Sequence, residues 1–444
     1  MDLKGKHVVV AGMAQSGLAV VAFVAARGAR VSAVDSKPLE QLPGASAAIE
    51  AAGADFRPQS ADAFSDADLV VVSPGVPADL PELEAARARG VRVIGEVELA
   101  GAFLEGSTIG ITGANGKTTT TALAGHILRE CGIPVQAGGN IGTPVTAMVE
   151  SSRPERWNVL ELSSFQLETI DSFRARIGAC LNVTPDHLDR HHTFENYAAA
   201  KGRLFETQRE GDFAVLNAGD AACLGYAEHA RSTAVWFGWE RRSAGVFADE
   251  KAVYYDGHAF LETAAIPLRG RHNVENVMAA SAAARLAGAP LERIAAAVRT
   301  FPGVEHRIEF VRRLSGVDFY NDSKATNVDA TMKAIDAFGG GLWIILGGKD
   351  KGSDYTVLRE PLSEKAKAVL LIGAAAPKIE AHLGDAVRLI GAGTMADAVR
   401  AAWSEAVPGD TVLLAPACAS FDQFSDYEHR GRVFKDLVRS LEPK

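Results

Sequence analysis

The stretch Thr108-Ile-Gly-Ile-Thr-Gly-Ala-Asn-Gly-Lys-Thr-Thr-Thr120 runs from a β-rich segment into a helix-like segment, 117–131. A glycine-rich turn between a strand and a helix points backbone N–H groups at a phosphate, and the helix N-terminus adds a positive dipole. In such a loop Lys117 pairs with β- and γ-phosphate oxygens, and the Thr118 hydroxyl ligates Mg²⁺. The match to GxxxxGK[ST] is imperfect because Ile111 occupies the first glycine position. The stretch favours an ATP or GTP site over an ordinary turn.

On both sides of this loop, short β-rich runs alternate with helical segments, which is typical of parallel sheets covered by helices. The expected strands are 7–10, 29–34, 69–72, 91–94, 108–112, 158–161, 178–183, 213–217, 342–346, 368–372 and 411–414. A Pro-Gly pair at 302–303 indicates a linker. We predict three α/β domains, each with a mainly parallel sheet flanked by helices: a nucleotide-type domain at 1–100, a central P-loop domain at 101–303 and a Rossmann-like domain at 304–444.

The composition excludes several classes of protein. The 444 residues include 46 basic and 55 acidic side chains, a net charge of −9, which disfavours a general nucleic-acid binder. Apolar content is ordinary, and no apolar run is long enough to cross a membrane. Four cysteines lie far apart without a CxxC pair, so neither a zinc cluster nor a disulfide framework is indicated. We predict a cytoplasmic multidomain protein without a membrane or nucleic-acid partner.

Acidic and histidine side chains follow two of the expected strands. Glu161 ends one strand, where a P-loop enzyme needs a metal ligand. Asp186 and His187 follow the next strand and are candidates for metal binding or proton transfer, whereas His191 and His192 fit a polar surface loop better. Lys201 lies in a helical pattern, and the residues alone predict only a solvated lysine.

The N-terminal turn Gly12-Met-Ala-Gln-Ser-Gly17 imitates a dinucleotide-binding fingerprint. Asp35 ends the second strand, where such folds place an acid on ribose hydroxyls. Ala14 replaces the central glycine, which weakens an NAD site. Another nucleotide, a nucleotide sugar, or a purely structural turn remain open on these residues.

The chain resembles the ATP-dependent Mur ligases, and within them the enzymes that add D-glutamate. The matching motifs run in order along the chain: TGANGKTTT (112–120), GGNIGTP (138–144), ELSSFQLE (161–168), NVTPDHLDRH (182–191), YAAAKGRLF (197–205), GRHNVENVMAA (270–280), HRIE (306–309), NDSKATN (321–327), LGGKDKGSD (346–354) and APACASFDQF (415–424). The N-terminal nucleotide-type domain separates the chain from the related folylpolyglutamate synthases.

The resemblance implies an amide ligation in peptidoglycan precursor synthesis, with ATP as co-substrate and two Mg²⁺ ions. The substrates would be UDP-N-acetylmuramoyl-L-alanine and D-glutamate, and the enzyme is expected to act as a monomer. The substrate carboxylate would attack the γ-phosphate to give an acyl phosphate, which the D-glutamate amine would then attack. Lysines and Mg²⁺ would neutralise the charge where a carboxylate approaches a triphosphate.

The resemblance also implies roles for individual residues, including a carbamate on Lys201 that turns a cation into a metal ligand. The implied catalytic residues are Lys117, His187 and Lys201, and the implied metal ligands are Thr118, Glu161, His187 and carbamylated Lys201. The implied ATP contacts are Gly113, Asn115, Gly116, Lys117, Thr118, Thr119, Asn276, Arg307, Asp322 and Lys324. The UDP-substrate contacts are Gln15, Ser16, Asp35, Ser36, Gly75 and Asn140, and the D-glutamate contacts are Thr326, Lys351, Ser420 and Tyr427.

Three weaker alternatives remain at this point. The first is a Mur-type ligase that adds another amino acid. The second is a P-loop ATPase without ligation, and the third is an NAD-dependent dehydrogenase. Near the ATP contacts, the sequence also favours His272 and Asn273 as polar residues at a helix start, with Asn273 as the N-cap.

Overall fold

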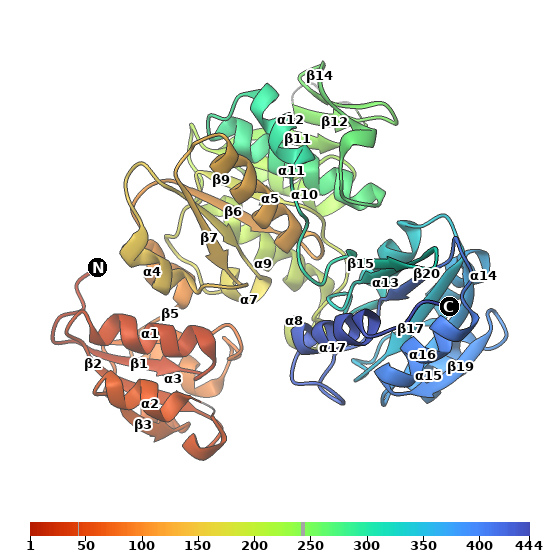
Figure 1. Cartoon of the computed structure of the whole chain (residues 1–444). Helices are drawn as coiled ribbons and strands as arrows, with labels where there is room; N and C mark the ends of the chain where they lie inside the picture. The colour runs from red at the N-terminus through yellow and green to blue at the C-terminus, as the bar shows by residue number, and fades with distance from the viewer. Residues whose placement is uncertain (43, 241–244) are drawn as a thin grey trace. The chain divides into compact units, whose positions relative to one another are not determined.

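The computed structural model describes residues 1–42, 44–240 and 245–444. These residues form two compact units. The first contains residues 1–265 and 275–301, and the second contains residues 266–274 and 302–444. The first unit holds two sheets and the second holds one (Figure 1).

The N-terminal sheet has five parallel strands in the order β3-β2-β1-β4-β5. Its elements are β1 (His7–Ala11), α1 (Gln15–Ala25), β2 (Arg30–Asp35), η1 (Leu39–Gln41), α2 (Ala45–Ala51), β3 (Asp55–Pro58), η2 (Ala61–Phe64), β4 (Leu69–Val72), α3 (Pro81–Ala88) and β5 (Arg92–Gly95). Val8 and Val10 of β1 pack against α1 and α2, whereas Val9 and Ala11 pack on the opposite face with α3. Strand alternation thus buries both faces, as the uninterrupted apolar run of a parallel strand requires.

The strand order reverses between β1 and β4, and this reversal locates a binding crevice. In open α/β sheets, ligands bind beyond the carboxyl ends of the strands at such a switch point. Gly17 allows α1 to begin close to β1, because a Cβ at this position would lie 1.8 Å from the Gly12 carbonyl oxygen. The crevice therefore opens directly above the glycine turn.

The central sheet has nine strands in the order β14-β13-β12-β11-β10-β9-β6-β8-β7. Its elements are α4 (Glu96–Gly101), β6 (Thr108–Thr112), α5 (Lys117–Glu130), β7 (Val135–Gly139), α6 (Val145–Met148), η3 (Val149–Ser151), β8 (Trp157–Glu161), α7 (Ser164–Leu167), β9 (Ile177–Cys180), α8 (Leu188–His191), α9 (Phe194–Glu206), β10 (Phe213–Asn217), α10 (Ala221–His229), β11 (Thr233–Gly238), β12 (Gly245–Ala248), β13 (Ala252–Tyr255), β14 (His258–Glu262), η4 (Thr263–Ala265), α11 (Arg271–Leu286) and α12 (Leu291–Arg299). Strand β6 lies between β8 and β9, parallel to both. The phosphate loop, Glu161 and the segment after β9 therefore share one edge of the sheet.

The C-terminal sheet has six strands in the order β15-β16-β20-β17-β18-β19, with only the β15–β16 pair antiparallel. Its elements are β15 (Glu309–Leu314), β16 (Val317–Asn321), α13 (Val328–Asp336), β17 (Leu342–Gly347), η5 (Thr356–Leu358), α14 (Arg359–Lys365), β18 (Ala366–Ile372), α15 (Ala376–Leu383), β19 (Leu389–Gly393), α16 (Met395–Glu405), β20 (Thr411–Leu414) and α17 (Tyr427–Arg439). Ile344 and Leu346 face α13, α14 and α15, while Trp343 and Ile345 face α16 and α17. The predicted class, α/β with helices on both faces of mainly parallel sheets, is confirmed.

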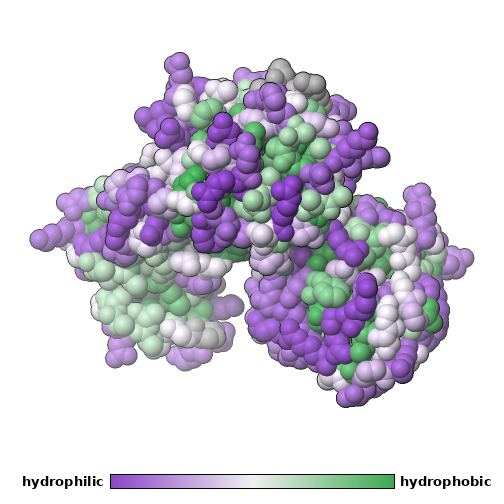
Figure 2. Space-filling view, turned by 45° about the horizontal axis from the view of Figure 1, so that its top comes forward, coloured by the Kyte–Doolittle hydropathy of each residue, from purple (hydrophilic) through white to green (hydrophobic). Residues whose placement is uncertain are grey.

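The hydropathy of the surface agrees with this layered interior. Hydrophilic side chains cover much of the face seen in Figure 2, and apolar ones are scattered among them or gathered over the part at lower left. Among the described residues, no helix combines the length and apolarity needed to span a bilayer.

Candidate active site

The phosphate loop is held by the backbone and by an asparagine from a neighbouring segment. Gly113 and Gly116 have φ values of 148° and 87°, in the region that favours glycine. Asn182 fixes the loop, because its backbone and side-chain oxygens accept hydrogen bonds of 2.8 Å from the Ala114 and Asn115 N–H groups. The Lys117 ammonium donates to the carbonyl oxygens of Gly113 and Ala114, each at 2.9 Å. The loop is thus preformed before helix α5.

Glu161 is the last residue of strand β8, as predicted, and it lies beside this loop. Its side chain is buried, and Oε1 accepts a hydrogen bond of 3.0 Å from the Asn140 amide. Oε2 is buried without a hydrogen-bond partner among the described residues. A buried carboxylate oxygen without a partner is costly unless a cation or donor completes it. Together with the Thr118 hydroxyl at the start of α5, this donor set fits a hard, oxygen-preferring cation such as Mg²⁺.

Lys201 received two different predictions: a solvated lysine from the helical pattern, and a carbamylated metal ligand from the family resemblance. Its side chain is 1% exposed on α9, so the solvated lysine predicted from the helical pattern alone is wrong. Its Nζ donates to the Gly113 carbonyl oxygen at 2.8 Å and lies 4.5 Å from the centre of the Tyr197 ring. Burial and the nearby Lys117 ammonium lower the pKa of Lys201 to about 7. Two lysines therefore meet at one carbonyl of the phosphate loop.

The three histidines after β9 differ in exposure, and one of them differs from its prediction. His187 is 44% exposed and has a φ of 54° at the start of α8, with Nε2 at 3.7 Å from Asp186 Oδ2. His192 is exposed, as predicted. His191 is buried instead, so its prediction as a surface-loop residue is wrong. It stacks on Phe165, accepts or donates a 2.9 Å hydrogen bond with Ser164 Oγ, and burial lowers its pKa to about 4.

All six residues expected to contact the UDP substrate line one cavity of about 1010 Å³ at the switch point of the N-terminal sheet. They are Gln15, Ser16, Asp35, Ser36, Gly75 and Asn140. The Asp35 carboxylate accepts hydrogen bonds from the N–H groups of Met13 (2.7 Å) and Lys37 (2.9 Å), which anchors the glycine turn. Because Asn140 also donates to Glu161, the cavity reaches the edge of the central sheet that carries the phosphate loop.

Asn276 belongs to the phosphate-loop side of the first unit. A Cβ on Gly116 would lie 2.3 Å from the Asn276 amide oxygen, and Thr120 Oγ1 donates to that oxygen at 3.3 Å. The predicted N-cap at Asn273 is wrong, because α11 already begins at Arg271. The Asn273 amide instead donates to the Arg269 carbonyl oxygen at 2.6 Å, from inside the first turn of the helix.

In the second unit, Arg307, Asp322, Lys324 and Tyr427 gather beside the end of β16. Asp322 is 1% exposed, and burial raises its pKa to about 6, although the charges of Arg307 and Lys324 and the Ile308 N–H oppose this shift. The Lys324 ammonium lies 5.4 Å from the centre of the Tyr427 ring. The tyrosine side chain therefore lies against a residue expected at the phosphates.

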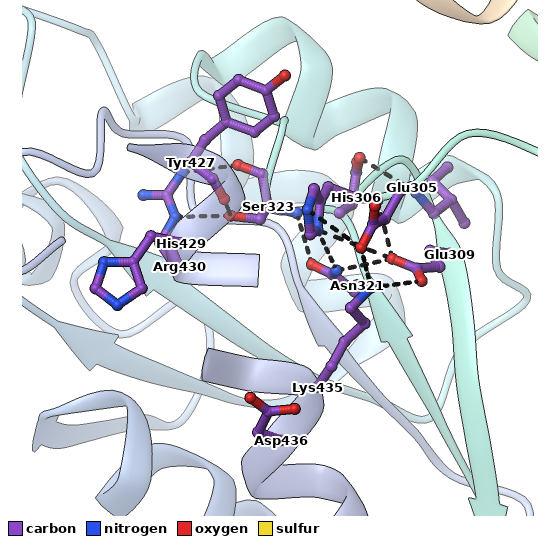
Figure 3. Close-up of polar contacts among 12 residues, drawn as sticks. Glu305, His306, Glu309, Asn321, Ser323, Tyr427, His429, Arg430, Lys435 and Asp436 are labelled. Carbon is purple, nitrogen blue, oxygen red and sulfur yellow. Dashed lines mark hydrogen bonds and ion pairs between the residues drawn. The ribbon is translucent and has the colours of Figure 1, made fainter. Parts of the chain in front are cut away.

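Two glutamates and a histidine next to Arg307 form a cluster that already contains the ammonium group of a lysine. Glu305, His306 and Glu309 offer ligand atoms within 4.8 Å of one another. However, the Lys435 ammonium lies 2.5 Å from Glu305 Oε1 and 3.0 Å from Glu309 Oε1 (Figure 3). Asn321 bonds to both His306 and Glu309 at 2.8 and 3.0 Å. The Lys435 ammonium thus occupies the place between the two carboxylates, and the cluster supports the loop that carries Arg307.

The remaining predicted residues lie on three loops that contact one another at the carboxyl edge of the C-terminal sheet. Thr326 lies on the first loop, Lys351 on the second and Ser420 on the third. Lys349 and Ala419 exchange backbone hydrogen bonds of 2.8 and 3.1 Å, and the Ala417 N–H donates to the Ala325 carbonyl oxygen at 2.9 Å. Ser420 is 2% exposed, and Lys351 is exposed.

Sequence reasoning missed a further support of these loops, Arg430 of α17. Its buried guanidinium donates to Ser323 Oγ and to the Ser323 carbonyl oxygen at 3.0 and 2.7 Å (Figure 3). It also donates to the Cys418 carbonyl oxygen at 3.0 Å. The sequence gives no local signal for this role, because the acceptors lie 107 and 12 positions away.

Comparisons with known proteins agree with this three-sheet arrangement. Family models match in order: "Mur ligase MurD-like, N-terminal domain" at residues 6–95, "Mur ligase middle domain" at 111–284, and "Mur ligase, glutamate ligase domain" at 306–418. The chain is 63% identical to a UDP-N-acetylmuramoylalanine–D-glutamate ligase of Solibacter usitatus, covering 100% of both chains. Proteins of the same name from Acidobacterium capsulatum and Koribacter versatilis are 53% identical (99% of this chain, 97% of the relative) and 51% identical (99% of both).

Solved structures share the fold at lower identity. A pseudomurein peptide ligase type C from Methanothermus fervidus has a TM-score of 0.63 and 17% identity, covering 99% of this chain and 100% of that one. A UDP-N-acetylmuramate–alanine ligase from Thermotoga maritima has a TM-score of 0.63 and 20% identity, covering 98% and 99%.

Proposed function

We propose, since the chain belongs to the Mur ligase family, that the residues described above divide the family's reaction among three domains, at 1–100, 101–303 and 304–444. The activity is the ATP-dependent addition of D-glutamate to UDP-N-acetylmuramoyl-L-alanine, a step of peptidoglycan precursor synthesis that yields ADP and phosphate. The observation that carries this conclusion is 63% identity over the full length of a ligase with this activity in its name.

The first domain binds the UDP end of the substrate. The cavity of about 1010 Å³ lies where an open α/β sheet binds nucleotides, and it contains Gln15, Ser16, Asp35, Ser36 and Gly75. Asn140 lies on the wall next to Glu161, so a sugar in this cavity would direct its L-alanyl carboxylate toward the central sheet.

The central domain binds ATP on the phosphate loop and Asn276. The N–H groups of Gly113, Gly116 and Thr119 and the α5 N-terminus favour an anion, Asn115 is held in the same loop by Asn182, and Lys117 supplies a cation. Thr118, Glu161 and His187 would hold two Mg²⁺ ions, which when bound neutralise phosphate charge during phosphoryl transfer. The buried, unpartnered Glu161 oxygen supports this assignment.

Lys201 completes the metal site as a carbamate. An amine reacts with CO₂ only when it is neutral, forming an N–C bond and releasing a proton. Burial lowers the pKa of Lys201 to about 7, so a large fraction is neutral near pH 7. The carbamate would also replace the repulsion between the Lys201 and Lys117 ammonium groups by attraction.

The C-terminal domain binds D-glutamate and supplies further contacts to ATP. Arg307, Asp322 and Lys324 contact ATP, while Thr326, Lys351, Ser420 and Tyr427 bind D-glutamate. The L-alanyl carboxylate attacks the γ-phosphate and displaces ADP. The D-glutamate amine then attacks the acyl carbon, and the tetrahedral intermediate expels phosphate as the amide forms. An ammonium such as Lys351 is the natural partner for a carboxylate of D-glutamate.

We place the reaction in the cytoplasm and the working enzyme as a monomer without a membrane or nucleic-acid partner. The net charge of −9 supports the lack of nucleic-acid affinity. A monomer is sufficient because this one chain supplies every group assigned above.

Phosphate release tests the function directly. Enzyme, ATP, Mg²⁺ and UDP-N-acetylmuramoyl-L-alanine are combined with D-glutamate, L-glutamate or no amino acid. We expect release only with D-glutamate, together with the matching mass gain on the nucleotide sugar. Release with another amino acid alone would overturn the D-glutamate assignment, and release without any acceptor would indicate an ATPase.

A further inference from the structure

An ion pair lies directly beside Lys351 in the C-terminal domain. Asp350 lies in the loop after strand β17, and Lys378 lies in the first turn of α15. The Lys378 Nζ donates to Asp350 Oδ2 at 2.8 Å. The other carboxylate oxygen, Oδ1, accepts a 2.7 Å hydrogen bond from the Tyr355 hydroxyl and one of 3.1 Å from the Ser353 N–H. Both oxygens of Asp350 are therefore occupied by donors other than Lys351.

The same network reaches the loop that carries Ser420. Tyr355 is fully buried, and its hydroxyl lies 3.0 Å from Cys418 Sγ as well as 2.7 Å from Asp350. Burial alone would raise the pKa of Asp350, but the hydrogen bonds from Lys378, Tyr355 and the backbone lower it to about 2. Asp350 is thus an anion at neutral pH, and Tyr355 links it from the Lys351 loop to the Ser420 loop.

Lys351 stands out among these groups because it has no such partner. It is exposed, and it forms no hydrogen bond or ion pair with any residue in the described ranges 1–42, 44–240 and 245–444. Its sequence neighbour Asp350 is the nearest acid along the chain. Without a cation on Asp350, that carboxylate would attract the Lys351 ammonium and repel an incoming dicarboxylate.

We infer that Lys378 is a positioning residue for amino-acid binding: it neutralises and orients Asp350, so that the Lys351 ammonium remains available to a carboxylate of the acceptor. Tyr355 contributes by linking Asp350 to Cys418 in the Ser420 loop. The inference rests on the proposed assignment of Lys351 to D-glutamate. It explains how Asp350 can lie next to Lys351 in the sequence without competing with D-glutamate for the Lys351 ammonium.

Removing each charge of the pair separately, and then both together, distinguishes this role from simple support of the loop. Lys378→Met leaves Asp350 charged and unpaired, and we expect KM for D-glutamate to rise about fivefold at low salt, with kcat and KM for ATP unchanged. Asp350→Asn removes the charge and is expected to leave KM for D-glutamate near the wild-type value. The double variant Lys378→Met, Asp350→Asn should return to that value. Lys378→Arg, which keeps the charge, should also resemble the wild type.

Two further measurements complete the test. Raising KCl to about 0.5 M should shrink the Lys378→Met effect toward twofold, because salt screens partly exposed charges. Lys365→Met is the matched control, since Lys365 pairs with Asp336 at 3.3 Å on the same domain but away from these loops; its KM values should not change.

The outcomes distinguish the inference from the assignment beneath it. If the double variant is as impaired as Lys378→Met, the pair is only a structural support and the inference is wrong. A KM for D-glutamate unchanged in Lys378→Met would also overturn it. If Lys351→Met leaves KM for D-glutamate unchanged, the assignment of Lys351 itself fails, whatever the Lys378 variants show.

Discussion

The lowered pKa of Lys201 makes a quantitative prediction about how the enzyme gains its carbamate. With a pKa of about 7, about half of the Lys201 side chains are neutral at pH 7, whereas only ~1 in 3,000 would be neutral at the ordinary value of 10.5. Because only the neutral amine attacks CO₂, burial should speed carbamate formation at pH 7 by about a thousandfold over an exposed lysine of equal nucleophilicity.

The pH dependence follows from the same fraction. The neutral fraction is about 0.09 at pH 6, about 0.5 at pH 7 and about 0.9 at pH 8 for a pKa near 7. The recovery rate at fixed dissolved CO₂ should therefore rise about fivefold from pH 6 to 7, about twofold from pH 7 to 8, and then level off.

The assay begins with enzyme depleted of CO₂ under inert gas at pH 6. The enzyme is returned to each pH at a fixed CO₂ pressure, and ligase activity is sampled over time at one common pH. Carbon-13 NMR with labelled CO₂ reports the carbamate signal on the same samples, and enzyme that was never depleted serves as the control. A recovery rate that keeps rising about tenfold per pH unit up to pH 9 would refute the reasoning, because it would indicate an ordinary lysine pKa.

Three other predictions concern single substitutions. Gly17→Ala places a Cβ 1.8 Å from the Gly12 carbonyl oxygen, so we expect a lower Tm and a rise of at least about tenfold in KM for the UDP substrate. Gly225→Ala is the control: it has open space around it inside helix α10, so KM should match the wild type and Tm should be equal or slightly higher. Glu161→Gln keeps the shape but removes the charge of the predicted metal ligand; we expect kcat to fall by ~100-fold or more with Tm little changed, and normal turnover at ordinary Mg²⁺ would contradict the assignment. Arg430→Met leaves three carbonyl or hydroxyl acceptors unpaired in the interior, and urea unfolding of the full chain should show the C-terminal unit destabilised by about 3 kcal/mol; a loss below about 1 kcal/mol would mean that water or other donors replace the guanidinium.

Local patterns were sufficient for much of the fold. The strand at 108–112 and the helix after Gly116 appear as β6 and α5, because an apolar β-rich run and a glycine-lysine turn specify both locally. Strands β3, β7, β11 to β16 and β19 were not predicted. They are four to six residues long, and β12 to β14 are paired by antiparallel contacts that the βα alternation elsewhere does not suggest.

Burial explains the failures at the site. His191 and Lys201 look polar and exposed in the sequence, yet both are buried: His191 stacks on Phe165 of α7, and Lys201 lies over the Tyr197 ring of its own helix and bonds to the phosphate loop. Apart from Tyr197, one turn before Lys201 on α9, nothing local encodes that burial, since it depends on where α7 and α9 pack. The position of Lys201 became interpretable before the structure only through the family resemblance.

The hydrogen bonds of Lys117 bear on how quickly and how tightly nucleotide binds. Its ammonium already donates to two carbonyl oxygens of its own loop, at 2.9 Å each, so part of its hydration shell is absent before any ligand arrives. An incoming triphosphate exchanges neutral acceptors for charged ones, which form stronger hydrogen bonds to an ammonium. Dehydration of this lysine therefore contributes little to the barrier for association. The Gly113 carbonyl oxygen keeps its hydrogen bond from Lys201, and the Ala114 carbonyl oxygen becomes free to accept from water. When nucleotide binds at this loop, the Lys117 ammonium stays in place and exchanges carbonyl oxygens for phosphate oxygens as its hydrogen-bond acceptors.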